Sequence, residues 1–426
     1  MIRVMPSDSA ASRKIAPLEQ FLSCVHCGLC LSACPTYLET GAEADSPRGR
    51  IYLMKRVEQQ STSLDADVVR HLDLCLGCRA CETACPSGVE YGALIEGARR
   101  HLAVAAPRKL MERWKRGLLA RLLPDAERLS PLADLVRLSV KLGLPRLARA
   151  RWAPMGLRRL AALAPDAVRG RRPRAILEPV GLPRATVALL TGCVAQALFP
   201  RINELTAKLL VLAGYRVLVP RGQVCCGALS AHLGEARDAE RWARRNVNAF
   251  SRSEADFVVT NAAGCGAMMR EYGRWLGGDA GYASSAHALA AKVRDVTQLL
   301  AAAPLPAKRA VPARIVYHDA CHLAHGQGVR AEPRALLRAI PGVELLELGD
   351  GEICCGSAGT YNLTEPEMAW RLGERKAKAV MATGADMVAA ANPGCILQIR
   401  AALRLNGRDL PVLHPVEILA RAQGID

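Results

Sequence analysis

Sixteen cysteines fall into four ordered groups along this 426-residue chain, and no cysteine lies outside them. The first group has the spacing Cys-x2-Cys-x2-Cys-x3-Cys-Pro, and the second repeats it 51 residues later. In bacterial ferredoxins this run holds cubane iron–sulfur clusters, and the cysteine before the proline ligates the other cluster. The sequence therefore predicts two [4Fe-4S] clusters. The expected ligands are Cys24, Cys27, Cys30 and Cys85 for the first cluster, and Cys34, Cys75, Cys78 and Cys81 for the second.

Zinc is the main alternative metal for clustered cysteines. A structural zinc site needs only four ligands, commonly arranged as CxxC pairs. Two complete copies of a four-cysteine run favour iron–sulfur clusters instead, and with them a role in carrying electrons.

The other eight cysteines form a second, longer repeat. Each copy contains a single cysteine, an adjacent pair followed by glycine, and a further cysteine, with corresponding cysteines 128, 129 and 130 residues apart. This spacing predicts two duplicated units of about 130 residues, called CCG units below. Adjacent cysteines suit the separate iron atoms of a cluster better than one zinc ion, and buried structural thiols would not explain a duplicated pattern. The candidate ligands are Cys193, Cys225, Cys226, Cys265, Cys321, Cys354, Cys355 and Cys395.

Short apolar segments precede the cysteines of the CCG units. We expect strands over 185–190, 215–219 and 257–260 in the first copy, and over 314–317, 343–346 and 387–390 in the second. Helical segments alternate with them, which is typical of α/β units with a mainly parallel sheet. Each cysteine would then follow the carboxyl end of a strand, where open α/β sheets bind ligands.

The N-terminal repeat has more residues between its cysteine runs than a minimal ferredoxin needs. Helices are expected over 50–59 and 65–73, which indicates a helix-rich ferredoxin domain. Arg48 and Arg50 either place positive charge beside the clusters, which raises their potentials, or pair with acidic neighbours. His26 is expected to tune the first cluster loop, because four thiolates are already available there.

The formal charge of +17 is concentrated between the two repeats. Residues 107–175 contain 18 Lys and Arg against 5 Asp and Glu, a net charge of +13. Such a stretch is either a docking surface for anionic lipid or an acidic subunit, or a solvated connector. Nucleic acid is not expected as a partner, because aromatic residues are 4% of the chain and no recognition motif accompanies the charge. The prolines expected to divide the stretch into short helices are Pro124, Pro131, Pro145, Pro154 and Pro165.

Residues 1–20 lack an apolar stretch of signal-peptide type, and no uninterrupted apolar run is long enough to span a bilayer. We therefore expect a cytoplasmic protein, free or held peripherally at the cytoplasmic face of the inner membrane. No strand–GxGxxG–helix fingerprint of a dinucleotide site is found. A chain with clusters alone cannot take a hydride from an alcohol carbon, so a partner chain is required.

These observations predict an α+β multidomain protein with a helix-rich two-cluster domain followed by tandem α/β units. The expected boundaries are 1–105 for the ferredoxin-type domain, 106–183 for the basic helical connector, 184–310 for the first CCG unit and 311–426 for the second.

Four segments carry a resemblance to the glycolate oxidase iron–sulfur subunit family: 24–28, 47–52, 81–88 and 354–361. The order of motifs is shared with the anaerobic glycerol-3-phosphate dehydrogenase iron–sulfur subunit and with heterodisulfide-reductase-like proteins. The resemblance implies an electron-transfer subunit of a flavin-linked glycolate dehydrogenase. FAD-containing partner subunits would oxidise glycolate to glyoxylate, and this chain would pass the electrons toward quinone or another acceptor. There are two alternatives. The chain could be the iron–sulfur subunit of a D-lactate or glycerol-3-phosphate dehydrogenase, or it could be a CCG-based thiol–disulfide reductase.

One departure from the wider family concerns the last ligand of each CCG unit. The heterodisulfide-reductase relatives end each unit in CxxC, whereas Met268 and Gln398 occupy that last position here. A fifth ligand would have to be histidine or backbone, and four thiolates could instead hold a cubane or zinc. The neighbouring His318, His322 and His325 are interpreted as structural groups rather than as ligands or quinone contacts.

Overall fold

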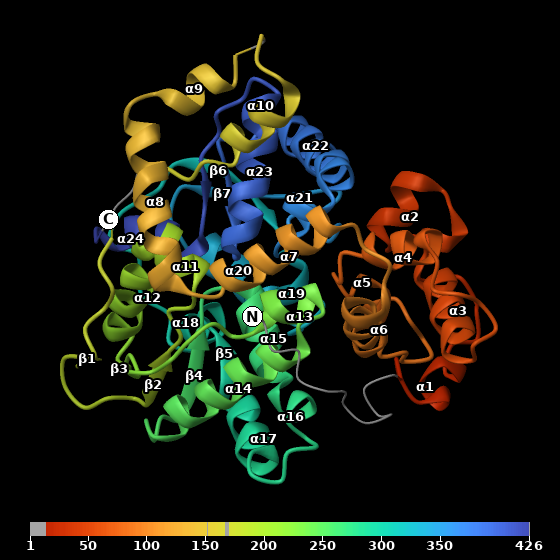
Figure 1. Cartoon of the computed structure of the whole chain (residues 1–426). Coiled ribbons are helices and arrows are strands. Elements are labelled where there is room, and N and C mark those ends of the chain that lie inside the picture. The colour runs from red at the N-terminus through yellow and green to blue at the C-terminus, as the bar shows by residue number, and fades with distance from the viewer. Residues whose placement is uncertain (1–13, 151, 167–169, 426) are drawn as a thin grey trace.

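The computed structural model describes residues 14–150, 152–166 and 170–425. Most of the 1–20 segment searched for a signal peptide therefore lies outside the described residues. A bundle of N-terminal helices lies beside a larger body that contains both sheets (Figure 1). Within the described part of the chain, no helix has the length and apolar character needed to cross a bilayer.

The regular elements of the N-terminal part are all helices over its described residues, joined by loops that carry the cysteines, in agreement with the helix-rich domain that the sequence predicts. Its helices are α1 (Leu18–Leu22), α2 (Pro35–Thr40), the 3-10 turn η2 (Glu43–Asp45), α3 (Pro47–Glu58), α4 (Ala66–Asp73), α5 (Ala80–Thr83) and α6 (Tyr91–Ala105). The two helices expected between the cysteine runs are confirmed as α3 and α4. Ser46 caps α3 by accepting from the Gly49 amide at 3.0 Å, and Asp65 caps α4.

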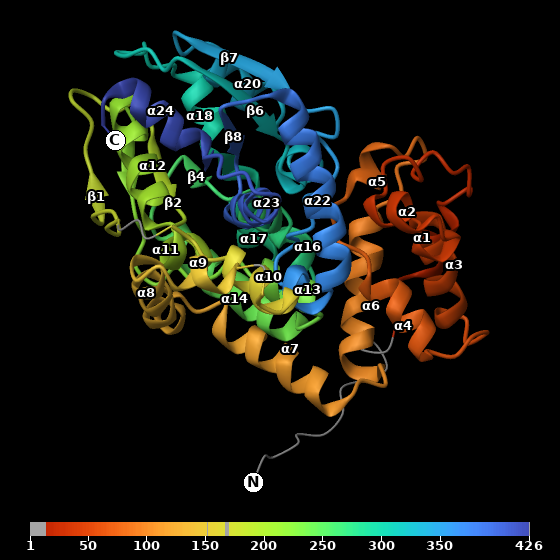
Figure 2. The same ribbon diagram turned by 90° about the horizontal axis from the view of Figure 1, so that it is seen from above.

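Four helices of the connector cross one side of the body (Figure 2). They are α7 (Leu110–Leu122), α8 (Ala126–Lys141), α9 (Leu144–Ala148) and α10 (Met155–Ala162). The expectation that Pro131 ends a helix is wrong, because it lies inside α8. Because Pro131 has no N–H, the carbonyl of Glu127 loses its helical hydrogen bond. Glu127 is exposed, so water can bond to that carbonyl instead. The other four prolines lie between or at the starts of helices, as expected.

The first CCG unit is an α/β layer structure. Its elements are β1 (Ile176–Leu177), β2 (Thr186–Leu189), α11 (Val194–Leu198), α12 (Pro200–Leu212), β3 (Arg216–Leu218), α13 (Ala228–Leu233), α14 (Ala236–Ser251), β4 (Phe257–Thr260), α15 (Ala263–Arg270), α16 (Tyr272–Trp275), α17 (Ala283–Lys292), β5 (Val293–Asp295) and α18 (Val296–Ala302). The strand order is β1-β3-β2-β4-β5, parallel except for β1.

The second CCG unit repeats this plan. Its elements are β6 (Ala313–His318), α19 (Cys321–Ala324), α20 (Ala331–Arg338), β7 (Val343–Glu347), α21 (Tyr361–Thr364), α22 (Pro366–Thr383), β8 (Met387–Ala390), α23 (Pro393–Leu405), β9 (Val412–Leu413) and α24 (Pro415–Gln423). The order β7-β6-β8-β9 matches β3-β2-β4-β5, and all pairs are parallel. The six expected strands, the parallel sheets and the duplication are confirmed.

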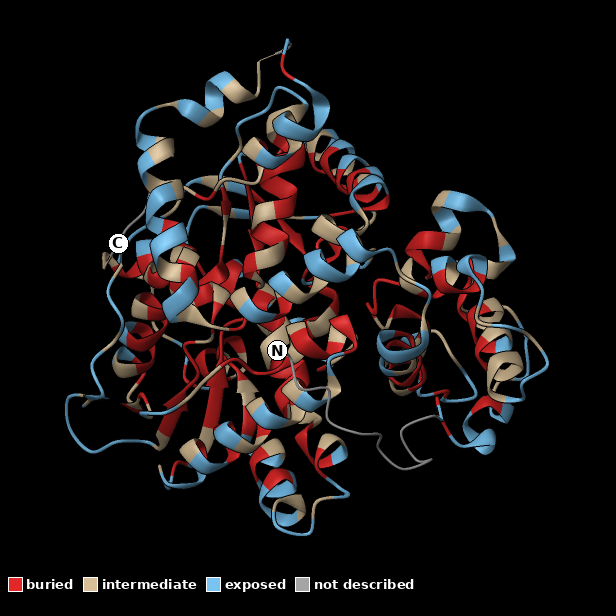
Figure 3. Ribbon diagram, viewed as in Figure 1, coloured by how far each residue is buried: buried red, intermediate tan, exposed pale blue. Residues whose placement is uncertain are grey.

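The two units pack against each other in a reciprocal way. Helix α12 of the first unit contacts α24 of the second, and the corresponding helices α20 and α18 make the same contact in reverse. Buried side chains of both sheets, such as Val187, Val259, Val316 and Val388, belong to one continuous core. Figure 3 shows the strands and the helices between them as the buried interior. This approximate twofold arrangement turns the cysteine-bearing ends of both sheets toward a common region.

Candidate metal centres

The four cysteines expected to hold the first cluster line one cavity, together with His26, Arg48 and Val89. Cys27 is exposed, and the other three cysteines are only partly buried. Arg48 donates to the His26 carbonyl at 3.1 Å and forms an ion pair with Glu43 at 2.7 Å. Arg48 therefore pairs with an acidic neighbour and also places positive charge at the rim of this cavity, so both expected roles apply.

The second set of cysteines is buried, unlike the first. The Tyr91 hydroxyl lies 3.5 Å from the Cys75 Sγ, and the Arg50 guanidinium lies 3.9 Å from the Cys34 Sγ. Arg50 is 1% exposed, donates to the His71 carbonyl at 2.6 Å and lies 3.7 Å from Asp45. Burial raises the pKa of the Cys78 and Cys81 thiols, so these sulfurs become thiolates only when a cation compensates their charge.

All eight CCG cysteines line one cavity of about 140 Å³ between the two units. In the first unit the Cys193 thiol lies 3.5 Å from the Cys225 sulfur. Cys193 follows β2, and Cys321 opens the helix that follows β6. Cys265 and Cys395 lie in the first turns of the helices after β4 and β8. These are the strands at which the chain order reverses in each sheet, the usual location of an α/β binding crevice.

The glycine of each Cys-Cys-Gly motif is required by packing. Gly227 and Gly356 have φ of +96° and +88°, in the left-handed region that favours glycine. A Cβ on Gly227 would lie 3.1 Å from the Ala239 carbonyl oxygen, and one on Gly356 would lie 2.5 Å from that of Ala369. The backbone after each cysteine pair therefore lies directly against the long helix of its unit, which fixes the direction of the sulfurs.

The residues that replace the fifth cysteine of the wider family take other roles. Met268 lines a second cavity and packs its methyl group near Gly227. Gln398 is 0% exposed, donates to the Ala369 carbonyl at 2.9 Å and lies 3.4 Å from the Asn362 amide. Met268 therefore packs against the Cys-Cys-Gly turn of the first unit, and Gln398 holds α22 of the second.

The two units differ at Lys376, a residue that belongs to no recognisable sequence motif. It lies on α22 at the position that Asn246 occupies on α14, 130 residues earlier, and both side chains are buried. Burial lowers the pKa of Lys376, while electrostatic interactions with Cys355, Asp350 and Cys354 oppose that change. Its ammonium donates to the Asp350 carbonyl. Asn246 instead donates to the Cys225 carbonyl at 2.9 Å.

The three histidines near Cys321 occupy different environments. His325 is bound by Thr83 of the ferredoxin part at 2.9 Å and by Arg330 at 3.1 Å. His322 lines the CCG cavity and meets His232 edge to face at 5.5 Å. Burial lowers the pKa of His322 to about 4, so its imidazole is neutral. His318 is 1% exposed and lies beside Cys355 and Cys395.

The second ferredoxin cysteine run packs directly against the CCG units. Cys78 shares an apolar cluster with Cys321 and Cys354 of the second unit. The Tyr361 hydroxyl donates to the Leu74 carbonyl at 2.8 Å, which ties α21 to the residue before Cys75.

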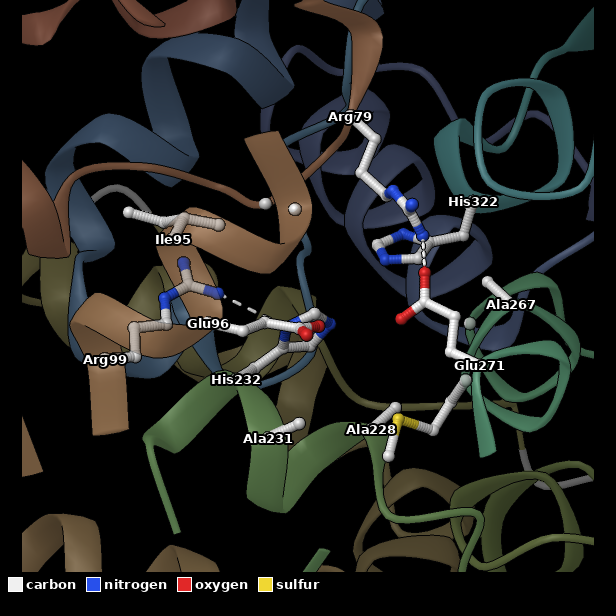
Figure 4. A pocket seen from close by; sticks show the side chains of 14 residues that line it. Arg79, Ile95, Glu96, Arg99, Ala228, Ala231, His232, Ala267, Glu271 and His322 are labelled. Carbon is white, nitrogen blue, oxygen red and sulfur yellow. Dashed lines mark hydrogen bonds and ion pairs between the residues drawn. The ribbon is translucent and has the colours of Figure 1, made fainter. Parts of the chain in front are cut away.

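A charged network makes the corresponding contact with the first unit. Arg79, between Cys78 and Cys81, pairs with Glu82 at 2.7 Å and with Glu271 of the first unit (Figure 4). Arg99 of α6 approaches His232 at 3.3 Å (Figure 4). Arg274 pairs with Glu271 at 2.6 Å. No sequence motif marks these partners, because Arg79 and Glu271 are 192 residues apart.

Comparisons with known proteins identify both kinds of cysteine-bearing unit. A model of the 4Fe-4S dicluster domain matches residues 20–89, and a model of the cysteine-rich domain matches residues 187–270 and 315–400. The chain is 38% identical over 420 residues to a probable glycolate oxidase iron–sulfur subunit from Bacillus subtilis (strain 168), covering 95% of this chain and 94% of that protein. The chain belongs to the family of glycolate oxidase iron–sulfur subunits.

Other relatives extend this family assignment. The glycolate oxidase iron–sulfur subunit of Escherichia coli (strain K12) is 35% identical over 405 residues, which are 94% of this chain and 93% of that protein. Lactate utilization protein A of an Exiguobacterium species is 29% identical over 237 residues, 55% of this chain and 96% of that protein. As a member of the glycolate oxidase iron–sulfur subunit family, this chain binds iron–sulfur clusters and transfers electrons within an oxidoreductase complex.

A solved structure shows the same fold without close sequence similarity. It is a hypothetical protein from Helicobacter pylori, with a TM-score of 0.58 and 9% identity, covering 93% of this chain and 72% of that one.

Proposed function

We propose that this chain is the electron-transfer subunit of a flavin-linked glycolate dehydrogenase, with two [4Fe-4S] clusters held by the ferredoxin cysteines and a further cluster in the CCG units. The observation that carries the proposal is the order of the three cysteine sites. A partly exposed site lies in the first run, a buried one in the second, and the buried one packs against the CCG cavity through Cys78, Cys321 and Cys354.

Each iron–sulfur cluster, when bound, accepts and releases one electron at a time. The exposed Cys27 gives an electron donor access to the first site, so we place the FAD-containing partner subunit there. The buried second site is shielded from water and suits transfer between sites within the chain. Arg48 and Arg50 supply positive charge beside these sites, which favours their reduced forms.

The connector supports a peripheral membrane contact on the acceptor side. Its net charge is +13, and more than half of the exposed large apolar side chains of the described residues lie between residues 110 and 160, on α7–α10 and the turns between them. Among the most exposed are Leu110, Met111, Trp114, Leu142 and Trp152. Basic charge combined with exposed aromatic and aliphatic side chains fits an anionic lipid surface, where a quinone acceptor would be available. The connector residue Arg151 lies outside the described residues.

Anaerobic purification of the chain with its natural partners tests this function. We expect a flavoprotein to co-purify, and the complex to reduce a dye with glycolate in preference to D-lactate or glycerol 3-phosphate. Activity with D-lactate alone would keep the electron-transfer role and reject glycolate, as the similarity to lactate utilization protein A allows. Assembly without any flavoprotein would reject the role itself.

Two serine variants separate electron transfer through the CCG units from a scaffold role. Cys225→Ser and Cys354→Ser should assemble with the flavoprotein and lose turnover with quinone. Full quinone turnover in both variants would restrict the CCG units to a scaffold.

A further inference from the structure

His318 has an unusual environment for a buried histidine. It is the last residue of β6, it is 1% exposed, and neither ring nitrogen has a hydrogen-bond partner among the residues that the structure describes. A buried polar group without a partner is costly, and one explanation for such a group in a folded protein is a bound ion. The adjacent Asp319 does not relieve it, since that carboxylate pairs with Arg334 at 2.7 Å.

Two candidate metal ligands lie next to this imidazole. One ring nitrogen of His318 and the Sγ atoms of Cys355 and Cys395 all lie within 4.8 Å of one another. Imidazole nitrogen and thiolate sulfur are both good ligands for iron and zinc. Cys355 and Cys395 also line the CCG cavity, so this group is continuous with the other cysteines of the second unit.

The first unit has no equivalent imidazole. Val187 of β2 pairs with Val217 and Phe257, and Ile315 of β6 pairs with Leu345 and Met387, the residues 128 and 130 positions later. This shared register places Leu190 at the position of His318, and Leu190 is buried in an apolar cluster. The duplicated cysteines are therefore accompanied by a nitrogen donor in the second unit and by a hydrocarbon side chain in the first.

We propose that His318 ligates an iron atom of the cluster in the second CCG unit, together with Cys355 and Cys395. It supplies the fifth ligand that Gln398 does not. The ligands that the second unit contributes are then mixed nitrogen and sulfur, whereas those of the first unit are sulfur alone. The inference rests on the proposed presence of a cluster in the CCG units, but not on the identity of the substrate.

The test uses the full-length protein, isolated anaerobically with and without ¹⁵N-labelled histidine. Iron, zinc and sulfide per chain are measured, and pulsed EPR of the reduced protein detects nitrogen bound to a paramagnetic cluster. His318→Leu makes the second unit resemble the first, and His318→Cys restores a ligand without nitrogen. His414→Asn is the matched control, because His414 is also buried in the second unit but caps α24 by accepting from the Val416 amide at 3.2 Å.

Wild-type protein and His414→Asn should show the ¹⁵N coupling. His318→Leu should lose the coupling and up to about four iron atoms per chain, the content of one cubane. His318→Cys should regain the iron without the coupling. If His318→Leu does not fold, His318→Cys alone decides, because coupling that persists there overturns the proposal.

Other outcomes also reject it. Wild-type iron in a folded His318→Leu variant would show that the histidine is not a ligand. Zinc instead of iron in the second unit, or no metal there in a wild-type complex that still oxidises glycolate, would overturn the iron assignment and leave the electron-transfer function standing.

Discussion

The two glycines of the duplicated Cys-Cys-Gly motif, compared with Gly407 outside it, give three substitutions whose costs should differ in a defined order. Gly407, Gly227 and Gly356 all have φ between +73° and +96°, so alanine at each position meets the same unfavourable backbone region. That strain costs about 1–2 kcal/mol. At Gly407 a Cβ would have no described atom within 4 Å, so Gly407→Ala measures the backbone term alone.

At the two motif glycines, Gly227 and Gly356, an added Cβ would also crowd the neighbouring helix, which increases the cost beyond that of the backbone strain. The added Cβ of Gly227→Ala would lie 3.1 Å from a carbonyl oxygen, which a small shift of the backbone can relieve. In Gly356→Ala the distance would be 2.5 Å, and overpacking of that kind costs about 1–3 kcal/mol more. We therefore expect destabilisation of roughly 1–2 kcal/mol for Gly407→Ala, slightly more for Gly227→Ala, and about 3–5 kcal/mol for Gly356→Ala.

Thermal unfolding followed by circular dichroism under anaerobic conditions measures these differences. At about 2–4 °C per kcal/mol, Gly356→Ala should lower the Tm by roughly 10 °C and Gly407→Ala by only a few degrees. Gly356→Ala should also bind less iron, because the helix that fixes Cys354 and Cys355 is displaced. Equal Tm values for Gly356→Ala and Gly407→Ala would refute the argument that helix packing, rather than backbone conformation alone, requires this glycine.

Three further predictions concern ligation, pH and charge. Cys85→Ser should alter the EPR signal of the partly exposed cluster and Cys34→Ser that of the buried one; the opposite result would contradict the exchange of ligands between the two runs. Burial raises the pKa of Asp295 from 3.8 to about 6, so its contribution to stability is complete below pH 3.8 and is lost, by about 3 kcal/mol, as the pH rises from 3.8 through about 6. Asp295→Asn should therefore gain more Tm relative to wild type at pH 8 than at pH 4, and equal differences at both values would contradict this. Lys376→Met should lower the potential of the second-unit cluster by an amount on the order of tens of millivolts, whereas the same change at Asn246 should have little effect in redox titration.

Local patterns were sufficient to predict most of the architecture. The six strands that precede or follow the cysteines of the CCG units are short and mostly apolar, and all six are confirmed with ends within one residue of those expected. The strands β5 and β9 were not predicted, because each is only two or three residues long. Pro131 misled the prediction because its cost inside a helix depends on whether water reaches the freed carbonyl, which the sequence does not reveal.

The arrangement of the sites depends on contacts that leave no local pattern. The reciprocal packing of the two units, which brings eight cysteines to one cavity, is set by buried faces far apart in the chain. His318 illustrates the limit most clearly. A histidine at the end of a strand usually has a hydrogen-bond partner, and only the folded structure reveals that this one has none among the described residues. A residue-by-residue comparison of the two CCG units pairs Lys376 with Asn246, but such a comparison does not show that both side chains are buried.

The position of Arg79 has a consequence for how the protein is assembled. Arg79 lies inside the loop that presents Cys78 and Cys81, and it forms the ion pair with Glu271 that holds the ferredoxin part against the first CCG unit. Binding of a cluster by Cys78 and Cys81 fixes the loop that carries Arg79, so we expect formation of the second cluster to strengthen this interface. A chain that lacks this cluster should therefore be cleaved faster in limited proteolysis than the cluster-loaded protein.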